Sequence, residues 1–389
     1  MAREGGRLLA AAIRVDVRPG GTESRGHDLG PIASQDPSGS CERRSWFHVS
    51  PSRPTKFQDM GSHVVRALVV TAHGDRGVLQ IQQRQLADPG PAEAQVRVAA
   101  SGINFVDVYQ RQGIYPFPTP FVLGGEGAGE VVAVGSDVSG VAVGDRVAWA
   151  NVPGSHVEAL NIAANALVPV PDEVAADVAA AAMLQGMTAH YLVTSTYPVQ
   201  SGDSVLVHAA AGGVGQLLVQ MAKARGAFVI GTVSTAQKEA VARRVGADQV
   251  IRYEALPTDE LAAEVRRRNN DAPVQVVYDG VGEATFDASL ATLAPRGMLV
   301  LFGASSGQVP PVNPQRLNSG GSLFLTRPTL AHYIATREEL LWRGSEVLRA
   351  IAEGSLRLDI GGKYPLTNAV QAYDDLESRR TIGKLILQP

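Results

Sequence analysis

The segment Ser204-Val-Leu-Val-His208 runs directly into Ala209-Ala-Ala-Gly-Gly-Val-Gly215. The first part is typical of a buried β-strand, and the second matches G-x-G-x-x-G with alanine in the first position, as Ala210-x-Gly212-x-x-Gly215. Gly212 would let backbone N–H groups approach a pyrophosphate, and Gly215 would let the following helix pack closely on the strand. A glycine-rich turn with a purely structural role is the alternative.

Strands and helices alternate after this segment, beginning with an expected helix over Val214–Ala224. The next expected strands are Phe228–Val233, Val250–Tyr253, Val274–Asp279 and Met298–Gly303, and the helices between them are Gln237–Val245, Thr258–Arg268 and Ala284–Leu293. Such alternation predicts βαβ units and therefore an α/β, doubly wound Rossmann fold around a parallel sheet.

The end of the second strand of this series indicates which dinucleotide would bind. An NAD site needs an acidic residue there for the ribose hydroxyls, but Ser234, Thr235 and Lys238 stand at this point. Hydroxyl groups and an ammonium group would instead bind a 2′-phosphate. The sequence therefore predicts NADPH as the cofactor. The alternative is that Lys238 is only a solvated residue in the first turn of a helix.

The chain before this region has a different pattern. Short runs rich in Val and Ile, such as Val64–Thr71 and Ala94–Ala100, are separated by glycine, proline and aspartate, which predicts a small, partly open β-barrel. Asn104–Gln112 is an expected short helix, and Ala175–Ser195 an Ala-rich one. We expect a barrel domain formed by 61–187 and 328–389, and a Rossmann domain formed by 188–327.

Residues 1–60 lack regular apolar periodicity, and we expect them to form a disordered N-terminal extension. A targeting peptide is the alternative, although acidic residues such as Glu4 and Asp16 count against it.

Composition excludes several classes of protein. The chain has 389 residues with 35 basic and 38 acidic side chains, and this balance gives no reason to expect nucleic acid as a partner. No apolar run is long enough to predict a membrane span. Cys41 is the single cysteine, which excludes an internal disulfide and a zinc site built from two or more thiolates. We expect a cytoplasmic protein.

A series of segments, in order along the chain from about Val64 onward, resembles the medium-chain dehydrogenase/reductase family. The likeness is to its zinc-free quinone oxidoreductases related to zeta-crystallin. The segments are SGINFVDVYQRQGIYP (Ser101–Pro116), GGEGAGEVVAVG (Gly124–Gly135), VLVHAAAGGVGQLLVQ (Val205–Gln220), GTVSTAQK (Gly231–Lys238), VVYDGVG (Val276–Gly282), FGASSG (Phe302–Gly307), LTRPTL (Leu325–Leu330), KYPL (Lys363–Leu366) and LESRRTIGKLIL (Leu376–Leu387). The resemblance implies that the barrel is of the GroES-like kind.

Zinc-dependent relatives carry a cysteine where Asn104 stands and a histidine where Gly125 stands. The resemblance therefore implies that no metal takes part. Gly280 and Gln185 stand where some relatives carry serine and lysine, so the range of substrates could differ from theirs.

The resemblance also implies a set of binding residues. Those expected to contact the cofactor are Asn104, Thr188, Gly212, Gly213, Val214, Gly215, Ser234, Lys238, Tyr253, Phe302, Gly303, Ala304, Ser305, Phe324, Thr326, Arg379 and Lys384. Those expected to contact the substrate are Asn104, Tyr109 and Tyr115, of which Tyr115 is the candidate proton donor, with solvent as the other candidate. Packing is the alternative role for Tyr109, helix capping for Asn104, and a surface ion pair for Arg379.

We therefore expect an enzyme that reduces a quinone with NADPH and without a metal, acting mostly by orienting the two reactants. A reductase of enal or enone double bonds on the same scaffold is the alternative, and a non-catalytic NADPH-binding protein is an alternative of another class. The edge of a strand near Ser322–Thr326 could pair with a second copy, as in the homodimer that the resemblance implies.

Overall fold

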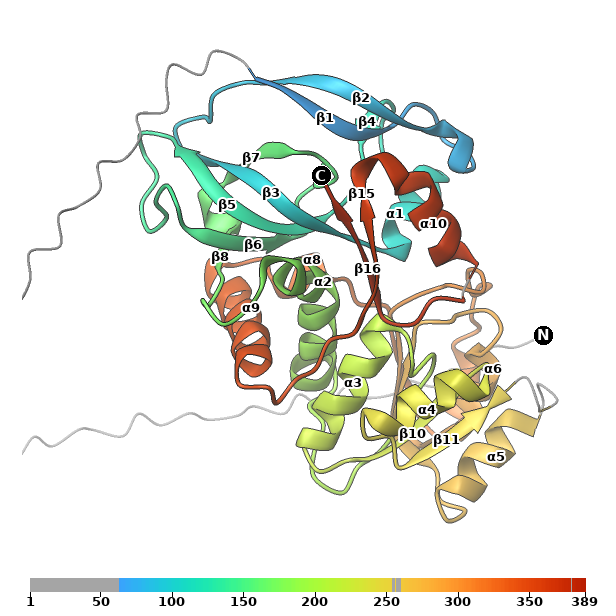
Figure 1. The fold of residues 1–389 in the computed structure, drawn as a ribbon. Helices are drawn as coiled ribbons and strands as arrows, with labels where there is room; N and C mark the ends of the chain where they lie inside the picture. The colour runs from blue at the N-terminus through green and yellow to red at the C-terminus, as the bar shows by residue number, and fades with distance from the viewer. Residues whose placement is uncertain (1–62, 254–255, 257–259, 379) are drawn as a thin grey trace, which may run out of the picture. The chain divides into compact units, whose positions relative to one another are not determined.

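The computed structural model describes residues 63–253, 256, 260–378 and 380–389 (Figure 1). They belong to one compact unit that spans 58–389. The predicted N-terminal extension, 1–60, and Arg379 lie outside the described residues.

The glycine-rich segment lies at the centre of a six-stranded sheet in which every described pairing is parallel. Its strands are β9 (Ser204–Val207), β10 (Phe228–Val233), β11 (Gln249–Arg252), β12 (Val274–Asp279), β13 (Leu293–Leu301) and β14 (Phe324–Thr326). Their order is β11-β10-β9-β12-β13-β14, which is the strand order of a Rossmann sheet. The predicted doubly wound fold is confirmed.

Four helices follow the strands of this sheet. They are α3 (Gly213–Ala224), α4 (Ala236–Arg244), α5 (Leu261–Arg268) and α6 (Phe286–Thr292). In α3, Leu217, Leu218 and Met221 recur at helical spacing and are buried, so the helix packs one apolar face against the sheet.

The rest of the described chain forms a seven-stranded and a three-stranded sheet. The strands are β1 (His63–Val70), β2 (Leu79–Leu86), β3 (Glu93–Ile103), β4 (Phe121–Val122), β5 (Glu126–Val134), β6 (Arg146–Ala150), β7 (Ala159–Ala163), β8 (Val168–Pro169), β15 (Ile360–Pro365) and β16 (Lys384–Gln388). The C-terminal strand β16 pairs with β3, so the end of the chain joins the sheet formed by the early strands (Figure 1). Pairings are antiparallel as expected, except that β15 and β16 are parallel.

Two long helices, α2 (Ala176–Tyr191) and α9 (Arg337–Ala352), pack together between the sheets (Figure 1). Small residues permit this close approach. A Cβ on Gly186 would lie 2.6 Å from Val347 Cγ1, so the two backbones meet at a distance that only glycine allows. Because α2 also contacts α3, β3, β5 and β6, it connects the parallel sheet to the seven-stranded one.

The shorter helices are α1 (Phe105–Arg111), α7 (Gln315–Ser319), α8 (Leu330–Tyr333) and α10 (Ala369–Glu377). Several boundaries differ from the sequence predictions. The helix expected to reach Ser195 ends as an α-helix at Tyr191 and continues as a π-helical turn, Leu192–Thr196. The strand expected over Met298–Gly303 begins earlier, at Leu293, and ends at Leu301, and the helix expected over Ala284–Leu293 is the shorter α6, Phe286–Thr292.

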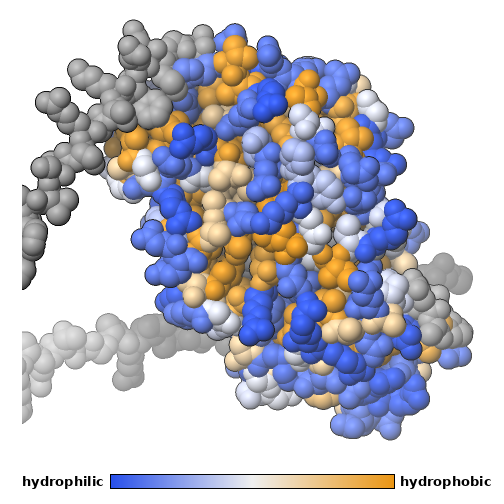
Figure 2. All heavy atoms as spheres, viewed as in Figure 1, coloured by the Kyte–Doolittle hydropathy of each residue, from blue (hydrophilic) through white to orange (hydrophobic). Residues whose placement is uncertain are grey.

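Within the described chain, no helix is both long and apolar enough to cross a bilayer. Figure 2 shows one face of the molecule, where hydrophilic residues predominate and apolar ones lie between them in smaller groups.

Candidate functional site

The loop after β9 leads into the N-terminus of α3 at the carboxyl edge of the parallel sheet. Ala209 adopts a left-handed backbone conformation with φ of 52°, which turns the chain toward the helix. A Cβ on Gly215 would lie 2.3 Å from the carbonyl oxygen of Ala209, so glycine is required for the helix to approach the strand. In the sheet, β9 lies between β10 and β12, at the switch point where doubly wound folds bind ligands.

Helix α2 projects Gln185 across this loop. Its Oε1 is buried and has no hydrogen-bond partner within the described chain. A Cβ on Gly213 would lie 2.0 Å from that oxygen. The first N–H groups of α3 therefore face a space that is bordered by the unpaired amide oxygen of Gln185. A ligand fits this space if its phosphate accepts from the N–H groups and a donor group next to the phosphate binds the Gln185 oxygen. Thr188, one turn further along α2, is buried.

The predicted 2′-phosphate residues lie where β10 passes into α4. The Thr235 hydroxyl accepts a hydrogen bond from the backbone N–H of Lys238 at 3.3 Å and caps the helix. Ser234 and Lys238 are half-buried, while Tyr253 is exposed. An open cleft of 720 Å³ lies beside α4, and its lining includes Gln237, Arg244, Asp359 and Arg380.

A separate cavity of 480 Å³ brings together residues far apart in the chain. Tyr109 and Tyr115 line one side, and their rings meet edge to face with 5.4 Å between centroids. Ala304, in the loop after β13, and Leu325, within β14, also line the cavity. The remaining lining residues are Ile114, Phe286, Leu301, Gly307, Gln308, Val309, Pro310, Val312 and Arg327.

The segments next to Ala304 are held by close backbone contacts. A Cβ on Gly303 would lie 2.5 Å from the carbonyl oxygen of Gly280, and a Cβ on Gly280 would lie 2.9 Å from Phe302 Cζ. The loops after β12 and β13 therefore touch, and the glycine at 280 leaves room for the ring of Phe302. Ser305 lies half-buried beside them, Thr326 is half-buried in β14, and Phe324 is 56% exposed in the same strand.

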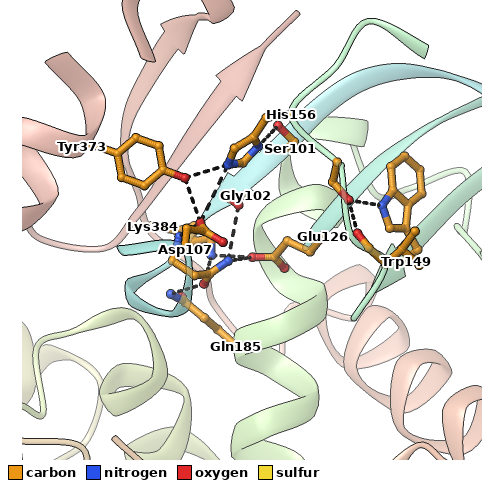
Figure 3. A network of polar contacts seen from close by, with 12 residues as sticks. Ser101, Gly102, Asp107, Glu126, Trp149, His156, Gln185, Tyr373 and Lys384 are labelled. Carbon is orange, nitrogen blue, oxygen red and sulfur yellow. Dashed lines mark hydrogen bonds and ion pairs between the residues drawn. The ribbon is translucent and has the colours of Figure 1, made fainter. Parts of the chain in front are cut away.

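Asn104 precedes α1, and its side chain belongs to a buried polar cluster with Glu126 and Lys384, two residues that Figure 3 labels. Its Nδ2 donates to Glu126 Oε1 at 2.7 Å, and its Oδ1 accepts from Lys384 Nζ at 2.5 Å. Lys384 also forms an ion pair with Glu126 Oε1 at 2.5 Å, and both side chains are at most 1% exposed. Because its amide is occupied by these partners, Asn104 is directed toward the cluster, and it is not among the residues that line the 480 Å³ cavity.

The same network extends through Asp107 into the core (Figure 3). The Asp107 carboxylate accepts from the backbone N–H of Asn104 at 2.7 Å and from the Tyr373 hydroxyl at 3.0 Å. Burial, reinforced by Asp107, raises the pKa of Tyr373 well above its usual value, so this phenol stays neutral and donates. His156 contacts Tyr373 at 2.8 Å and completes the chain of contacts.

The donors around Asn104 do not fit a zinc ion. Gly125 has no side chain to offer, and the Glu126 carboxylate is occupied by the Lys384 ammonium, whose positive charge would repel a cation. Within the described chain, no group of three or more His, Cys, Asp or Glu side chains could hold a metal.

Two family models match the chain: the alcohol dehydrogenase GroES-like domain over 90–199, and the zinc-binding dehydrogenase domain over 213–342. A quinone oxidoreductase of Pseudomonas aeruginosa is 43% identical over 84% of this chain and 100% of its own. The chain belongs to the quinone oxidoreductases of the medium-chain dehydrogenase/reductase family.

Solved structures agree with this family. The Escherichia coli quinone oxidoreductase, solved as a complex with NADPH, superposes with a TM-score of 0.81 at 43% identity, over 83% of this chain and 100% of that one. A mycobacterial protein, also complexed with NADPH, gives a TM-score of 0.80 at 48% identity, over 84% and 100% of the two chains. These likenesses confirm the predicted combination of a GroES-like barrel with a Rossmann domain.

In this member of the quinone oxidoreductase family, the sequence reasoning missed two residues. Glu126 follows Gly125 in a quoted motif but was given no role, and Arg327 lies in the quoted segment LTRPTL. Arg327 lines the 480 Å³ cavity and donates to the Leu301 carbonyl oxygen at 2.9 Å and to the Tyr115 hydroxyl at 3.2 Å. Charged residues inside motifs of apolar and glycine residues are the signal that would have found both.

Proposed function

We propose that this protein reduces quinones with NADPH as the source of hydride. The observation that carries the proposal is the 480 Å³ cavity, in which the tyrosines expected to contact the substrate share one space with Ala304 of the segment expected to contact the nicotinamide. A hydride acceptor held in this cavity would lie beside the reactive end of a dinucleotide whose pyrophosphate is bound at α3.

The cofactor site of the proposal follows the parallel sheet. Gly212, Gly213, Val214 and Gly215 present the N-terminus of α3 to the pyrophosphate, while Ser234, Lys238 and Tyr253 receive the 2′-phosphate end, with Arg379 as a further member. Thr188, Phe302 to Ser305, Phe324 and Thr326 border the nicotinamide half. NADPH supplies the hydride when bound.

Two residues of the buried cluster have an indirect role in this proposal. Asn104 and Lys384 are directed toward Glu126, so they act by fixing the start of α1, which carries Tyr109 into the cavity.

The cavity lining orients an aromatic acceptor and keeps water away from it. The rings of Tyr109 and Tyr115, which pack edge to face, supply aromatic surface against which a planar ring can pack. Arg327 donates to the oxygen of Tyr115, so this bond does not use the phenol proton, and Tyr115 remains able to donate that proton to a substrate oxygen.

The relatives support a quinone as the acceptor, since proteins from Pseudomonas aeruginosa and Escherichia coli named quinone oxidoreductases cover 84% and 82% of this chain. A second candidate is the reduction of a conjugated double bond, because a Burkholderia protein named 2-haloacrylate reductase is 38% identical over 84% of the chain.

Steady-state oxidation of NADPH distinguishes the two candidates and the non-catalytic alternative. We expect turnover with a naphthoquinone and at least tenfold lower kcat/KM with an α,β-unsaturated aldehyde. The opposite ranking would favour the double-bond reductase, and binding of NADPH without turnover of either compound would favour a non-catalytic role.

Replacement of Lys238 tests the cofactor. We expect Lys238→Ala to raise the KM for NADPH about tenfold and to leave the KM for NADH unchanged, because a charge-assisted contact to the 2′-phosphate is lost. The control is Lys363→Ala, which removes a surface lysine paired with Asp177. An unchanged KM for NADPH in Lys238→Ala would contradict the assignment.

We also propose a homodimer and a cytoplasmic location. Among the residues that the structure describes, strand β14 pairs with β13 alone, and Phe324 within it is 56% exposed, which supports edge pairing with a second copy. The single cysteine of the chain suits a reducing compartment. The mass of the protein in solution tests the dimer, and a monomer would contradict it.

A further inference from the structure

The cavity described above contains an unusual imbalance of charge. Among the described residues that line it, Arg327 alone carries a charge. The rest are aliphatic, aromatic or small, apart from Gln308 and the tyrosine hydroxyls. A guanidinium group is therefore presented to an otherwise neutral, largely apolar space.

The guanidinium group is held in place by neutral partners. Its Nη1 donates to the Leu301 carbonyl oxygen at 2.9 Å and its Nη2 to the Tyr115 hydroxyl at 3.2 Å. Within the described chain, Arg327 forms no ion pair, so its positive charge is oriented by hydrogen bonds and is neutralised by no carboxylate, while the side chain is exposed to solvent. Two acceptors that flank the group fix its plane, which lowers the entropy cost of binding a further acceptor.

The nearby cation Arg316 differs from Arg327 because a carboxylate neutralises its charge. Arg316 lies 5.7 Å from the ring of Phe286, a lining residue, but it pairs with Asp287 at 2.5 Å. Glu283 approaches the cavity next to Gly307 and does not pair with Arg327. Arg327 therefore supplies a positive charge directly at the cavity lining, partly screened by solvent because the side chain is exposed, while the Glu283 carboxylate borders the cavity beside Gly307.

We propose that Arg327 is an anion-recognition site that makes the enzyme prefer ring substrates bearing a carboxylate or sulfonate group. The proposal rests on the quinone reductase function for its substrate class. The apolar lining takes the planar ring, and the guanidinium takes the anionic substituent through charge-assisted hydrogen bonds. Neutral quinones bind through the apolar lining, so they are weaker substrates, and Arg327 acts on them only through its hydrogen bond to Tyr115.

Binding without turnover tests the anion site directly. Naphthalenesulfonate and its neutral isostere naphthalenesulfonamide are titrated calorimetrically into the wild-type protein and into Arg327→Gln, Arg327→Lys and Arg97→Gln. We expect wild type to bind the sulfonate about tenfold more tightly than the sulfonamide, which equals about 1.4 kcal/mol. Arg327→Gln should abolish this preference, Arg327→Lys should retain part of it, and Arg97→Gln should leave it unchanged.

Arg97→Gln is the matched control because it also removes one guanidinium, from an exposed pair with Glu130 on β3. Thermal unfolding checks that Arg327→Gln folds, and glutamine still offers a donor to the Leu301 carbonyl. Equal affinity of wild type for the two compounds would overturn the proposal. The proposal would also be overturned if Arg327→Gln lost affinity for NADPH but kept its preference for the sulfonate, because Arg327 would then be a cofactor contact.

Kinetics extends the test to substrates. The ratio of kcat/KM for naphthoquinone sulfonate to that for unsubstituted naphthoquinone should fall about tenfold in Arg327→Gln, since the intrinsic reactivity of each quinone cancels between wild type and variant. Added salt should lower this ratio in wild type only. If wild type reduces no quinone yet prefers the sulfonate ligand, the proposed function fails and the anion site stands. If it reduces both quinones with a ratio unaffected by Arg327, the anion site fails alone.

Discussion

Removal of the Lys384 ammonium should cost more stability than removal of any surface lysine. Lys384 and Glu126 are both at most 1% exposed and meet at 2.5 Å, so Lys384→Met leaves a buried carboxylate without its counter-ion. The carboxylate keeps two neutral donors, Asn104 Nδ2 at 2.7 Å and the backbone N–H of Leu184 at 2.6 Å.

Breaking a buried ion pair by deleting one partner costs about 3–5 kcal/mol. The two remaining donors place the expected loss of unfolding free energy at the lower end, about 3 kcal/mol. Removing both charges should cost less than removing one. In Lys384→Met/Glu126→Gln, the amide oxygen at 126 can still accept from Leu184, and neither position keeps a charge, so we expect a loss of about 1 kcal/mol relative to wild type.

Urea unfolding of the four proteins in this double-mutant cycle measures these values, with Lys363→Met as the surface control. Lys363 pairs with Asp177 and is 48% exposed in its side chain, so its removal should cost less than about 1 kcal/mol. Additive effects of the two substitutions, or a loss below about 1 kcal/mol in Lys384→Met, would refute the view that the buried charges depend on each other.

Three further predictions concern the loop, the cavity and the core. Gly215→Ala should lower the free energy of unfolding, measured in urea, by about 2–3 kcal/mol, because the added Cβ would lie 2.3 Å from a backbone atom. In Gly213→Ala the added Cβ would meet only the end of the Gln185 side chain, so this variant should instead weaken NADPH binding in a fluorescence titration. Tyr115→Phe should lower kcat for a quinone about tenfold and leave the Kd for NADPH unchanged, unless solvent supplies the proton. Burial lowers the pKa of His208, so the unfolded state binds more protons below about pH 6.5, and stability should fall there by up to about 1.4 kcal/mol per pH unit. His208→Asn should flatten that slope.

Local patterns were enough to predict the parallel sheet and its phosphate loop. Strands β10 and β12 occur at the expected residues, because each is set by apolar periodicity within its own segment. The end of α2 was less predictable, since the π-helical turn continues the helix directly, with no glycine or proline to mark the change.

The polar contacts between side chains of the site could not be predicted from local sequence patterns. The contacts of Asn104 and Lys384 with Glu126 were not predicted from the sequence, while their expected contact with the cofactor stays a prediction. A side chain that is charged in the sequence gives no sign of whether its partner will be solvent, a ligand or another buried charge, because that choice depends on which strands become neighbours.

The sequence by itself determined the Rossmann sheet, the glycine loop at its centre and the lack of a carboxylate after β10, because each depends on residues only a few positions apart. Only the tertiary structure decided that Lys384 neutralises Glu126, 258 residues away, and that Arg327 meets Tyr115 across 212 residues. These pairs form because β16 joins the sheet of β3 and because β13 and β14 bring their ends to α1. The charge inside the cavity is therefore a property of the assembled sheets, and no single segment encodes it.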